Sequence, residues 1–352
     1  PYEASTVAAN LAATGELRDP FGVASGPTAH VSPVYPFLLA LLIRVFRQPD
    51  LVIYAAVLFN ACLLGLAVAL LPNLSDAVFH DARPGVAGGI LLALSGRLMP
   101  QWEVALSALL LLAAASAVLF RTASAGGLFT GFSLLTNPVS LPALAVLAWS
   151  RGARYAVAVF AFAIALCAPW LIRNWMVLGA PYFIRDNFGL ELHISNNDQA
   201  GPDLASNQAL WTLHPNQSRE QAAVVTSMGE VPYNRARLAE AVEWIRAHPA
   251  RFLRLSTARV FYYWFPPLQE GWTAYPVWLM TALAAIGTWI ARRQRTVLLI
   301  AAAAVAYSLP FVVIQTVGRY RFPSLWMSAL LAGYAAHTLY LRGRSILTGR
   351  DL

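Results

Sequence analysis

The chain has 352 residues, of which 58% are hydrophobic and only 12% are charged, and its mean hydropathy is +0.55. These values exclude an ordinary soluble enzyme and are typical of a multi-pass membrane protein. All 25 basic residues are arginine, which fits a GC-rich bacterial genome. The net charge of +8 does not indicate nucleic-acid binding, because much of the arginine stands at the ends of apolar segments.

Residues 1–50 are predicted to form a juxtamembrane loop on the outer face of the membrane. Residues 2–17 have the apolar spacing of an amphipathic helix. The apolar run Val34–Phe46 is too short to span a bilayer comfortably, which favours a helix lying in the interface. Because the chain starts with Pro1 and shows no signal-peptide pattern, we expect a membrane helix to precede it in the full-length protein.

Residues 51–171 are predicted to form membrane helices. Four apolar segments carry this prediction: 51–71, 85–98, 105–120 and 155–171. A further segment, 128–149, is interrupted by Pro138 and Pro142, which indicates two half-helices that enter and leave the same face of the membrane.

Residues 172–272 form a polar excursion, expected on the outer face, with amphipathic helices at 234–247 and after Pro249. Residues 273–352 return to apolar helices, predicted at 275–290, 297–317 and 325–341. The arginine-rich motifs ARRQR and RGRS follow the first and last of these helices, on the inner face, as the positive-inside rule requires.

Motifs of common soluble chemistry are missing from the sequence: it has no Walker loop, GxGxxG, HExxH, CxxC or GxSxG. Cys62 and Cys167 lie inside apolar runs, which excludes a disulfide framework. What remains are acids at the outer ends of membrane segments, where a carboxylate can take a proton from an incoming hydroxyl group. These acids are Glu3, Glu16, Asp19, Glu103, Asp186 and Glu191.

The outer face of the membrane is also predicted to carry arginine, amide and aromatic side chains. This combination suits a site for a phosphate-bearing lipid or its sugar. Arg319 and Arg321 flank Tyr320 just before the last helix, and their spacing predicts that both guanidinium groups face one lipid headgroup. The alternative is a pair of snorkelling arginines. Weaker binding candidates in the stretch 169–197 are Arg173, Asn174, Arg185, His193, Asn196 and Asn197.

Three stretches resemble the GT-C superfamily of integral membrane glycosyltransferases, in the branch of protein O-mannosyltransferases and aminoarabinose lipid A transferases. They are Tyr2-Glu3 with the later GPTAHVSPVYPFLLALLIRVF, the stretch 169–197, and GRYRFPSLWMSALLAGYA. The resemblance implies an all-α polytopic transmembrane helix bundle of GT-C type with juxtamembrane periplasmic helices. It also implies inverting transfer of a sugar from a polyprenyl-phosphate donor to a glycan, lipid or protein acceptor, at the periplasmic face of the bacterial cytoplasmic membrane.

Site residues follow from the same resemblance. Glu3 matches the acid of the first outer loop that serves as general base, and Glu103 matches a second acid. Relatives often have Asp at these places, which leaves the assignment of the base open because Glu shifts the carboxylate by more than an ångström. His30 takes the place of the histidine before paired prolines, although Val31 and Ser32 interrupt that motif.

Divalent metal binding is left open by the sequence. Some relatives bind a metal near these loops, and His30 and His193 with nearby acids can supply ligands, but no tight ligand spacing is present and no metal is assigned. Two other functions compete with the enzyme: a transporter or flippase for lipid-linked saccharides, and a membrane scaffold. Ionisable groups at segment ends and the lack of a long internal repeat favour the enzyme, with membrane lipids as its other partners.

Overall fold

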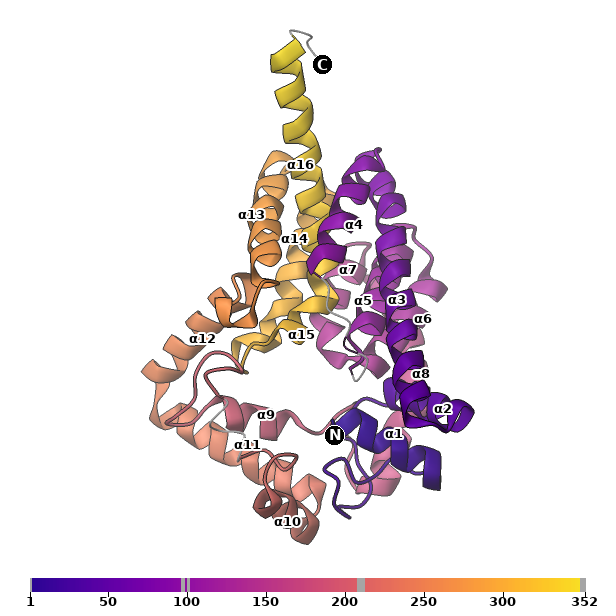
Figure 1. The fold of residues 1–352 in the computed structure, drawn as a ribbon, viewed down its shortest axis with the longest axis vertical. Helices are drawn as coiled ribbons and strands as arrows, with labels where there is room; N and C mark the ends of the chain where they lie inside the picture. The colour runs from indigo at the N-terminus through magenta and orange to yellow at the C-terminus, as the bar shows by residue number, and fades with distance from the viewer. Residues whose placement is uncertain (1, 96–98, 100–101, 208–212, 349–352) are drawn as a thin grey trace.

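The computed structural model describes residues 2–95, 99, 102–207 and 213–348, and this part of the chain is built from helices without a β-strand. Three helical segments are long and apolar enough to cross a membrane: α3 (Pro49–Phe79), α8 (Ala153–Leu178) and the segment Arg295–Val312. The predicted all-α membrane bundle is therefore confirmed (Figure 1).

Shorter apolar helices complete the bundle around these three. They are α4 (Arg83–Ser95), α5 (Val104–Leu119), α6 (Ala123–Thr136), α7 (Leu141–Trp149), α13 (Ala274–Ile290), α14 (Arg295–Ser308) and α16 (Leu325–Thr348). Helices α4 and α16 lie side by side at glycines: a Cβ atom on Gly88 would come within 2.5 Å of the Ala329 carbonyl oxygen. Small residues allow this approach, which favours association of helices in lipid.

Helices α6 and α7 lie on either side of a turn that contains Asn137. The Asn137 side chain accepts a hydrogen bond from the Val139 N–H at 3.3 Å and so caps the short helix Pro138–Ser140. At the other end of the pair, the Arg151 guanidinium group donates to the Leu119 carbonyl oxygen at 2.8 Å. Leu119 ends α5, just before α6, and Arg151 follows the end of α7. The chain therefore enters α6 and leaves α7 at the same end of the bundle.

Helix α3 is longer than its apolar core predicts. It continues through Pro72 and ends only at His80, which takes a left-handed φ of 56°. The gap between the predicted apolar segments 51–71 and 85–98 thus shrinks to residues 80–82, because Leu71 and Leu74 are buried and hold this turn of helix against the bundle.

The N-terminal segment and the excursion fold together at one end of the molecule, here called the polar end (residues 2–46 and 179–273), opposite the C-terminus (Figure 1). Its helices are α1 (Glu3–Thr14), α2 (Val34–Phe46), α9 (Phe188–Ser195), α10 (Arg219–Met228), α11 (Glu230–Ala247) and α12 (Pro249–Trp264). The predicted helix Val34–Phe46 is confirmed with the same bounds, and Asn60 of α3 donates to its Tyr35 hydroxyl at 2.8 Å.

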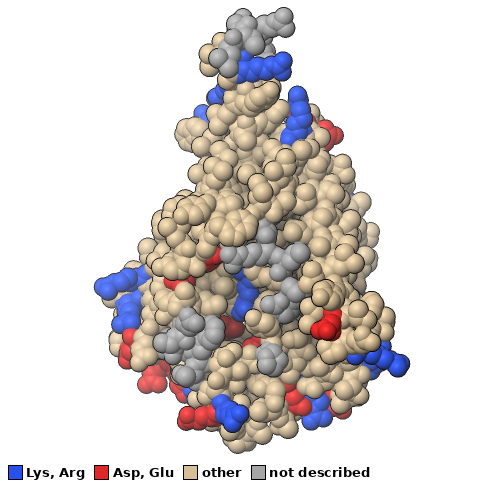
Figure 2. Space-filling model, in the orientation of Figure 1, with Lys and Arg blue, Asp and Glu red and all other residues tan. Residues whose placement is uncertain are grey.

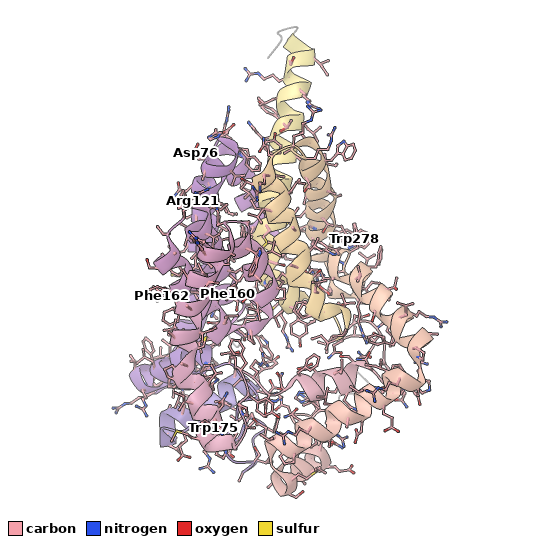
Figure 3. The ribbon with its side chains drawn as sticks, turned by 180° about the vertical axis from the view of Figure 1, so that it is seen from behind. Asp76, Arg121, Phe160, Phe162, Trp175 and Trp278 are labelled. Atoms are coloured by element: carbon pink, nitrogen blue, oxygen red, sulfur yellow. The ribbon has the colours of Figure 1, made fainter. Side chains whose placement is uncertain are left out.

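The outer surface of the bundle is apolar, as lipid contact requires. Seen from behind, Phe162 points outward from the middle of the bundle, whereas Trp175 lies at the polar end (Figure 3). Asp76 and Arg121 lie towards the opposite end of the bundle (Figure 3). This distribution gives the molecule two polar boundaries separated by an apolar belt.

The two ends of the molecule are expected to lie on opposite sides of the membrane. In a background with Cys62→Ala and Cys167→Ala, a cysteine at the exposed position Ala205 should react with a membrane-impermeant maleimide added outside. A cysteine at the exposed position Gln294 should react only after the cells are opened. The opposite labelling pattern would refute this orientation.

Candidate functional site

A cavity of about 740 Å³ separates the polar end from the helix bundle. Its walls come from the start of α1, the segment around His30, the start of α5, the turn at Asn137, helix α9 and the segment 314–325. Figure 2 shows the molecule hollowed at this level, with basic and acidic side chains inside the hollow. Charged groups of both signs thus meet in a space large enough for a sugar and its phosphate.

Glu3 and Glu103 both line this cavity, although a hundred residues separate them in the chain. Glu3 begins α1, and Glu103 stands immediately before α5. The preceding residues bring the two helix starts together, because the Tyr2 ring meets the Trp102 ring edge to face at 5.1 Å. The aromatic residue before each acid therefore packs the two outer segments against each other.

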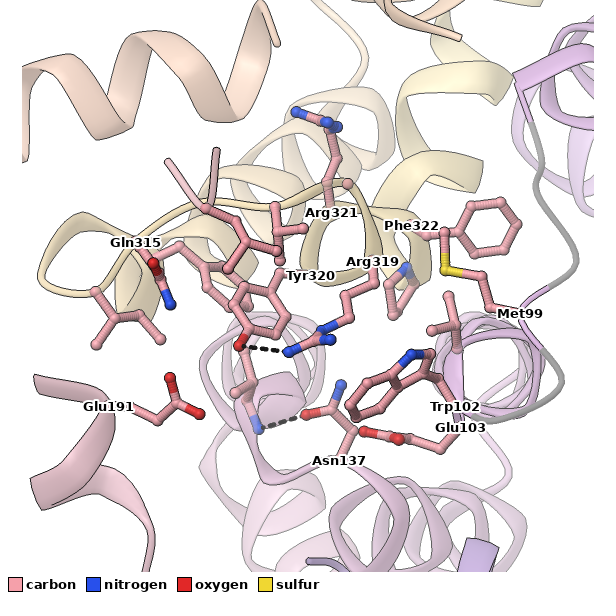
Figure 4. Close-up of a pocket in the computed structure, with 18 of the residues that line it drawn as sticks. Met99, Trp102, Glu103, Asn137, Glu191, Gln315, Arg319, Tyr320, Arg321 and Phe322 are labelled. Carbon is pink, nitrogen blue, oxygen red and sulfur yellow. Dashed lines mark hydrogen bonds between the residues drawn. The ribbon is translucent and has the colours of Figure 1, made fainter. Parts of the chain in front are cut away.

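Arg319 is held with its guanidinium group in the cavity. The group lies 3.9 Å from the centre of the Trp102 ring, and its Nη2 donates to the Tyr320 hydroxyl at 3.3 Å. Tyr320 is itself fixed by stacking on Phe311 at 5.0 Å. In Figure 4 the Arg319 side chain points down between Tyr320 and Trp102, with Glu191 opposite. A planar guanidinium group placed in this way can bind a phosphate oxygen pair.

Arg321 makes different contacts, so the expected pair of guanidinium groups facing one headgroup is not formed. Its Nη2 pairs with Glu270 at 2.8 Å, and its Nη1 donates to the carbonyl oxygens of Tyr262 and Tyr263. It points away from Arg319 in Figure 4. The cause is local, because residues 318–321 are helical, and side chains two positions apart on a helix point about 200° from each other.

Glu3, His30 and His214 form a cluster at the polar side of the cavity. One ligand atom from each residue lies within 4.8 Å of the others, and His214 Nε2 is 3.8 Å from Glu3 Oε1. His30 is only 2% exposed, its Nδ1 has no hydrogen-bond partner among the described atoms, and burial holds its pKa well below the ordinary value. A neutral imidazole with a free nitrogen is the form that binds a metal ion.

Arg185 is the one further arginine of the excursion among the described cavity walls, and its Nε donates to the His30 carbonyl oxygen at 2.9 Å. Two other predicted binding residues brace the fold away from the cavity. Arg173 donates to the carbonyl oxygens of Thr28 and Leu17, and Asn174 donates to that of Tyr182.

The remaining predicted residues also lie outside the described cavity walls. His193 faces Glu240 of α11, with its Nδ1 3.3 Å from the carboxylate. Asn196 donates to the Val313 carbonyl oxygen at 2.9 Å, and Asn197 donates to the Ile194 carbonyl oxygen at 3.0 Å. Both amide NH2 groups are therefore committed to backbone carbonyl oxygens, that of Asn196 to Val313 and that of Asn197 to the last turn of α9.

Sequence reasoning missed His214 and Asn137, and it listed Glu191 only as an acid at a segment end. Each reaches the cavity through long-range folding: Asn137 from the turn between α6 and α7, Glu191 from α9, and His214 from the loop before α10. The proline after Asn137 and the one after His214 mark loops, but a loop signal alone does not indicate which loops meet.

A pair of buried acids lies behind the His30 segment. Asp186 is 3% exposed and Glu230 is 5% exposed, and the two carboxyl groups are close enough to shift each other's pKa. Burial raises the pKa of Asp186 to about 6 and, together with the neighbouring Asp186, raises the pKa of Glu230 well above its ordinary value. Two carboxyl groups so placed share a proton most readily.

This acid pair is expected to make stability depend on pH. Burial raises the pKa values of both carboxyl groups in the folded state. The contribution of the pair to the stability of the fold is therefore fully present below the unfolded-state pKa of about 4, and it is lost as the pH rises through about 6. The thermal midpoint in detergent should therefore fall between pH 5 and pH 8, and Asp186→Asn should reduce this fall. The exposed control Glu243→Gln on α11 should leave it unchanged. Equal falls in the wild type and Asp186→Asn would contradict the assignment.

The chain is an all-α polytopic helix bundle of GT-C type, with a helical polar end closing over a cavity at its boundary. Among solved structures, the chain is similar to the archaeal oligosaccharyltransferase AglB from Archaeoglobus fulgidus, which was solved in complex with an inhibitory peptide and a dolichol-phosphate. The TM-score is 0.52 at 13% sequence identity, and the match covers 99% of this chain and 48% of that chain. The chain thus spans about half the length of that enzyme. No protein-family model and no curated protein matches the chain.

Proposed function

We propose that the protein is a glycosyltransferase that moves a sugar from a polyprenyl-phosphate-linked donor to a lipid, glycan or protein acceptor. The observation that carries this proposal is the meeting of Glu3, Glu103 and Arg319 in one cavity where the polar end meets the apolar bundle. The dolichol-phosphate bound to the structural neighbour adds support for a lipid-linked donor. As part of this proposal, the site faces the outside of a bacterial cytoplasmic membrane.

Arg319 is assigned to the phosphate of the donor. Negative charge grows on this phosphate as the bond to the sugar breaks, and a guanidinium group fixed by Trp102 and Tyr320 needs no reorganisation to stabilise it. Arg185 adds a second positive charge to the lining of the cavity. Arg321 supports the assignment indirectly, because its pairing with Glu270 fixes the short helix that carries Arg319.

Glu3 is assigned as the general base, and Glu103 as the residue that orients the acceptor. The acceptor hydroxyl attacks the anomeric carbon, the bond to the phosphate breaks, and the hydroxyl proton passes to the carboxylate. A single displacement inverts the anomeric centre. Polyprenyl phosphate leaves with the electron pair of the broken bond.

Glu3, His30 and His214 also fit a divalent metal ion, since two imidazoles and a carboxylate are ligands that suit zinc. When bound there, such an ion would supply positive charge for binding a phosphate or hydroxyl oxygen. The predicted ligand His193 is not part of this cluster, because it faces Glu240.

Lipid binding provides the test of this proposal. Decaprenyl phosphate should raise the thermal midpoint of the detergent-solubilised protein, whereas decaprenol, which has the same chain without phosphate, should raise it less. Equal shifts with both lipids would contradict a phosphate site. Mass spectrometry of cell-envelope glycans with and without the gene would then identify the sugar and the acceptor.

A further inference from the structure

The segment Thr28–Ala29–His30 is an irregular stretch of the first loop, yet it carries the imidazole of the candidate site. An irregular segment needs side chains from elsewhere to fix it, since no helix satisfies its backbone groups. All three residues are buried. Their backbone partners therefore decide where the His30 ring lies.

Glu230, which begins α11, provides the central contact to this segment. Its Oε1 accepts the Ala29 N–H at 2.7 Å, and its Oε2 accepts the Thr28 hydroxyl at 2.5 Å. The same hydroxyl oxygen accepts the His30 N–H at 2.9 Å. One carboxyl group thus holds two residues directly and reaches the backbone of the third through a relay.

Three further groups hold the carbonyl side of the same segment. The Asp186 N–H donates to the Ala29 carbonyl oxygen at 3.2 Å, Arg173 donates to that of Thr28 at 2.7 Å, and Arg185 donates to that of His30 at 2.9 Å. Both Asp186 carboxyl oxygens are buried, have no hydrogen-bond partner among the described side chains and backbone groups, and lie near enough to the Glu230 carboxyl group to affect its pKa. Asp186 therefore holds the segment through its backbone and places its carboxyl group beside that of Glu230.

We propose that Glu230, paired with Asp186, is a positioning residue that fixes the 28–30 segment and thereby the His30 imidazole in the site. The proposal deepens the proposed function and rests on it for the role of His30. It makes α11, none of whose described residues lines the cavity, part of the machinery of the site. A structural acid would stabilise the fold alone, whereas a positioning acid also changes what His30 can bind.

Hydrogen–deuterium exchange of the full-length protein in detergent tests this inference, read on a peptide covering residues 27–31. Glu230→Ala removes the acceptor of the Ala29 N–H, so exchange of this peptide should become faster by on the order of tenfold or more. Glu230→Gln keeps one acceptor oxygen and should give an intermediate rate. Glu243→Ala, an exposed acid on the same helix, should match the wild type. Wild-type exchange in both Glu230 variants would overturn the inference.

Zinc binding gives the second readout, with Zn²⁺ alone as the probe in isothermal titration calorimetry. Glu230→Gln should weaken zinc binding about 10- to 100-fold, as losses of residues that orient a ligand do. Unchanged zinc affinity in a variant with faster exchange would overturn the link to His30. His214→Ala should weaken zinc binding without changing the exchange of residues 27–31. If the wild type binds no zinc, the metal part of the proposed function fails. The role of Glu230 is then decided by two measurements on Glu230→Gln, the exchange rate of residues 27–31 and the rate of sugar transfer.

Discussion

Replacing Glu3 with Gln is expected to lower sugar transfer by about a hundredfold or more, the usual contribution of general base catalysis. The substitution keeps the size and hydrogen-bonding capacity of the side chain and removes its basicity. Donor binding should be largely kept, because the donor phosphate is assigned to Arg319 on another wall of the cavity. The rate of transfer should be measured in membranes of a deletion strain that carries each full-length variant.

Two matched variants make the Glu3 result specific. Glu16→Gln removes the same charge from an exposed acid of the same loop and should keep the wild-type rate. Glu103→Gln should reduce the rate less than Glu3→Gln, since Glu103 only orients the acceptor in the proposed mechanism. An inactive Glu103→Gln beside a nearly normal Glu3→Gln would show that the two roles are reversed.

Arg319→Gln is expected to weaken binding of the polyprenyl-phosphate donor about 10- to 100-fold, the value of a charge-assisted contact to phosphate. Arg319→Lys keeps the charge but loses the planar group that lies on Trp102, so binding should still weaken about tenfold. Decaprenyl phosphate binding to the purified variants measures both effects. Unchanged affinity in Arg319→Gln would show that this arginine has no role in donor binding.

Arg321→Gln is the control that separates charge from position. It removes the arginine partner of Glu270 and the donors to the Tyr262 and Tyr263 carbonyl oxygens, so the fold should lose about 3 kcal/mol of stability. The folded fraction should bind donor more nearly like the wild type than Arg319→Gln does. A donor affinity reduced as far as that of Arg319→Gln would place both arginines at the phosphate.

Patterns of hydrophobicity predicted most of the fold. Apolar runs and their breaks gave the helix Val34–Phe46 with its bounds, and the interruption at Pro138 and Pro142 located the division between α6 and α7. Helix ends were less predictable, as in α3, where buried leucines carry the helix through Pro72 into a segment that reads as polar. Burial there depends on neighbouring helices, which local sequence does not specify.

The site was predictable in part for a similar reason. Glu3, Glu103 and Arg319 stand at ends of apolar segments, where the chain meets the membrane boundary, and all three line the cavity. His214, from a loop, and Glu191, from α9, join them only because segments distant in the chain fold together. The amides Asn196 and Asn197 have the composition of a binding site but are used by the backbone, a distinction that only hydrogen-bond partners can make.

The fate of the donor tests the central claim most directly. Proteoliposomes that contain the wild-type protein or Glu3→Gln should be given polyprenyl-phosphate-linked sugars from the host membrane, labelled in the sugar, with extracted envelope acceptors. The proposed function predicts that the wild type releases free polyprenyl phosphate and that the label becomes covalently attached to an acceptor, at a rate about a hundredfold lower in Glu3→Gln. Movement of the intact labelled donor across the bilayer, without release of polyprenyl phosphate, would contradict it and identify a flippase.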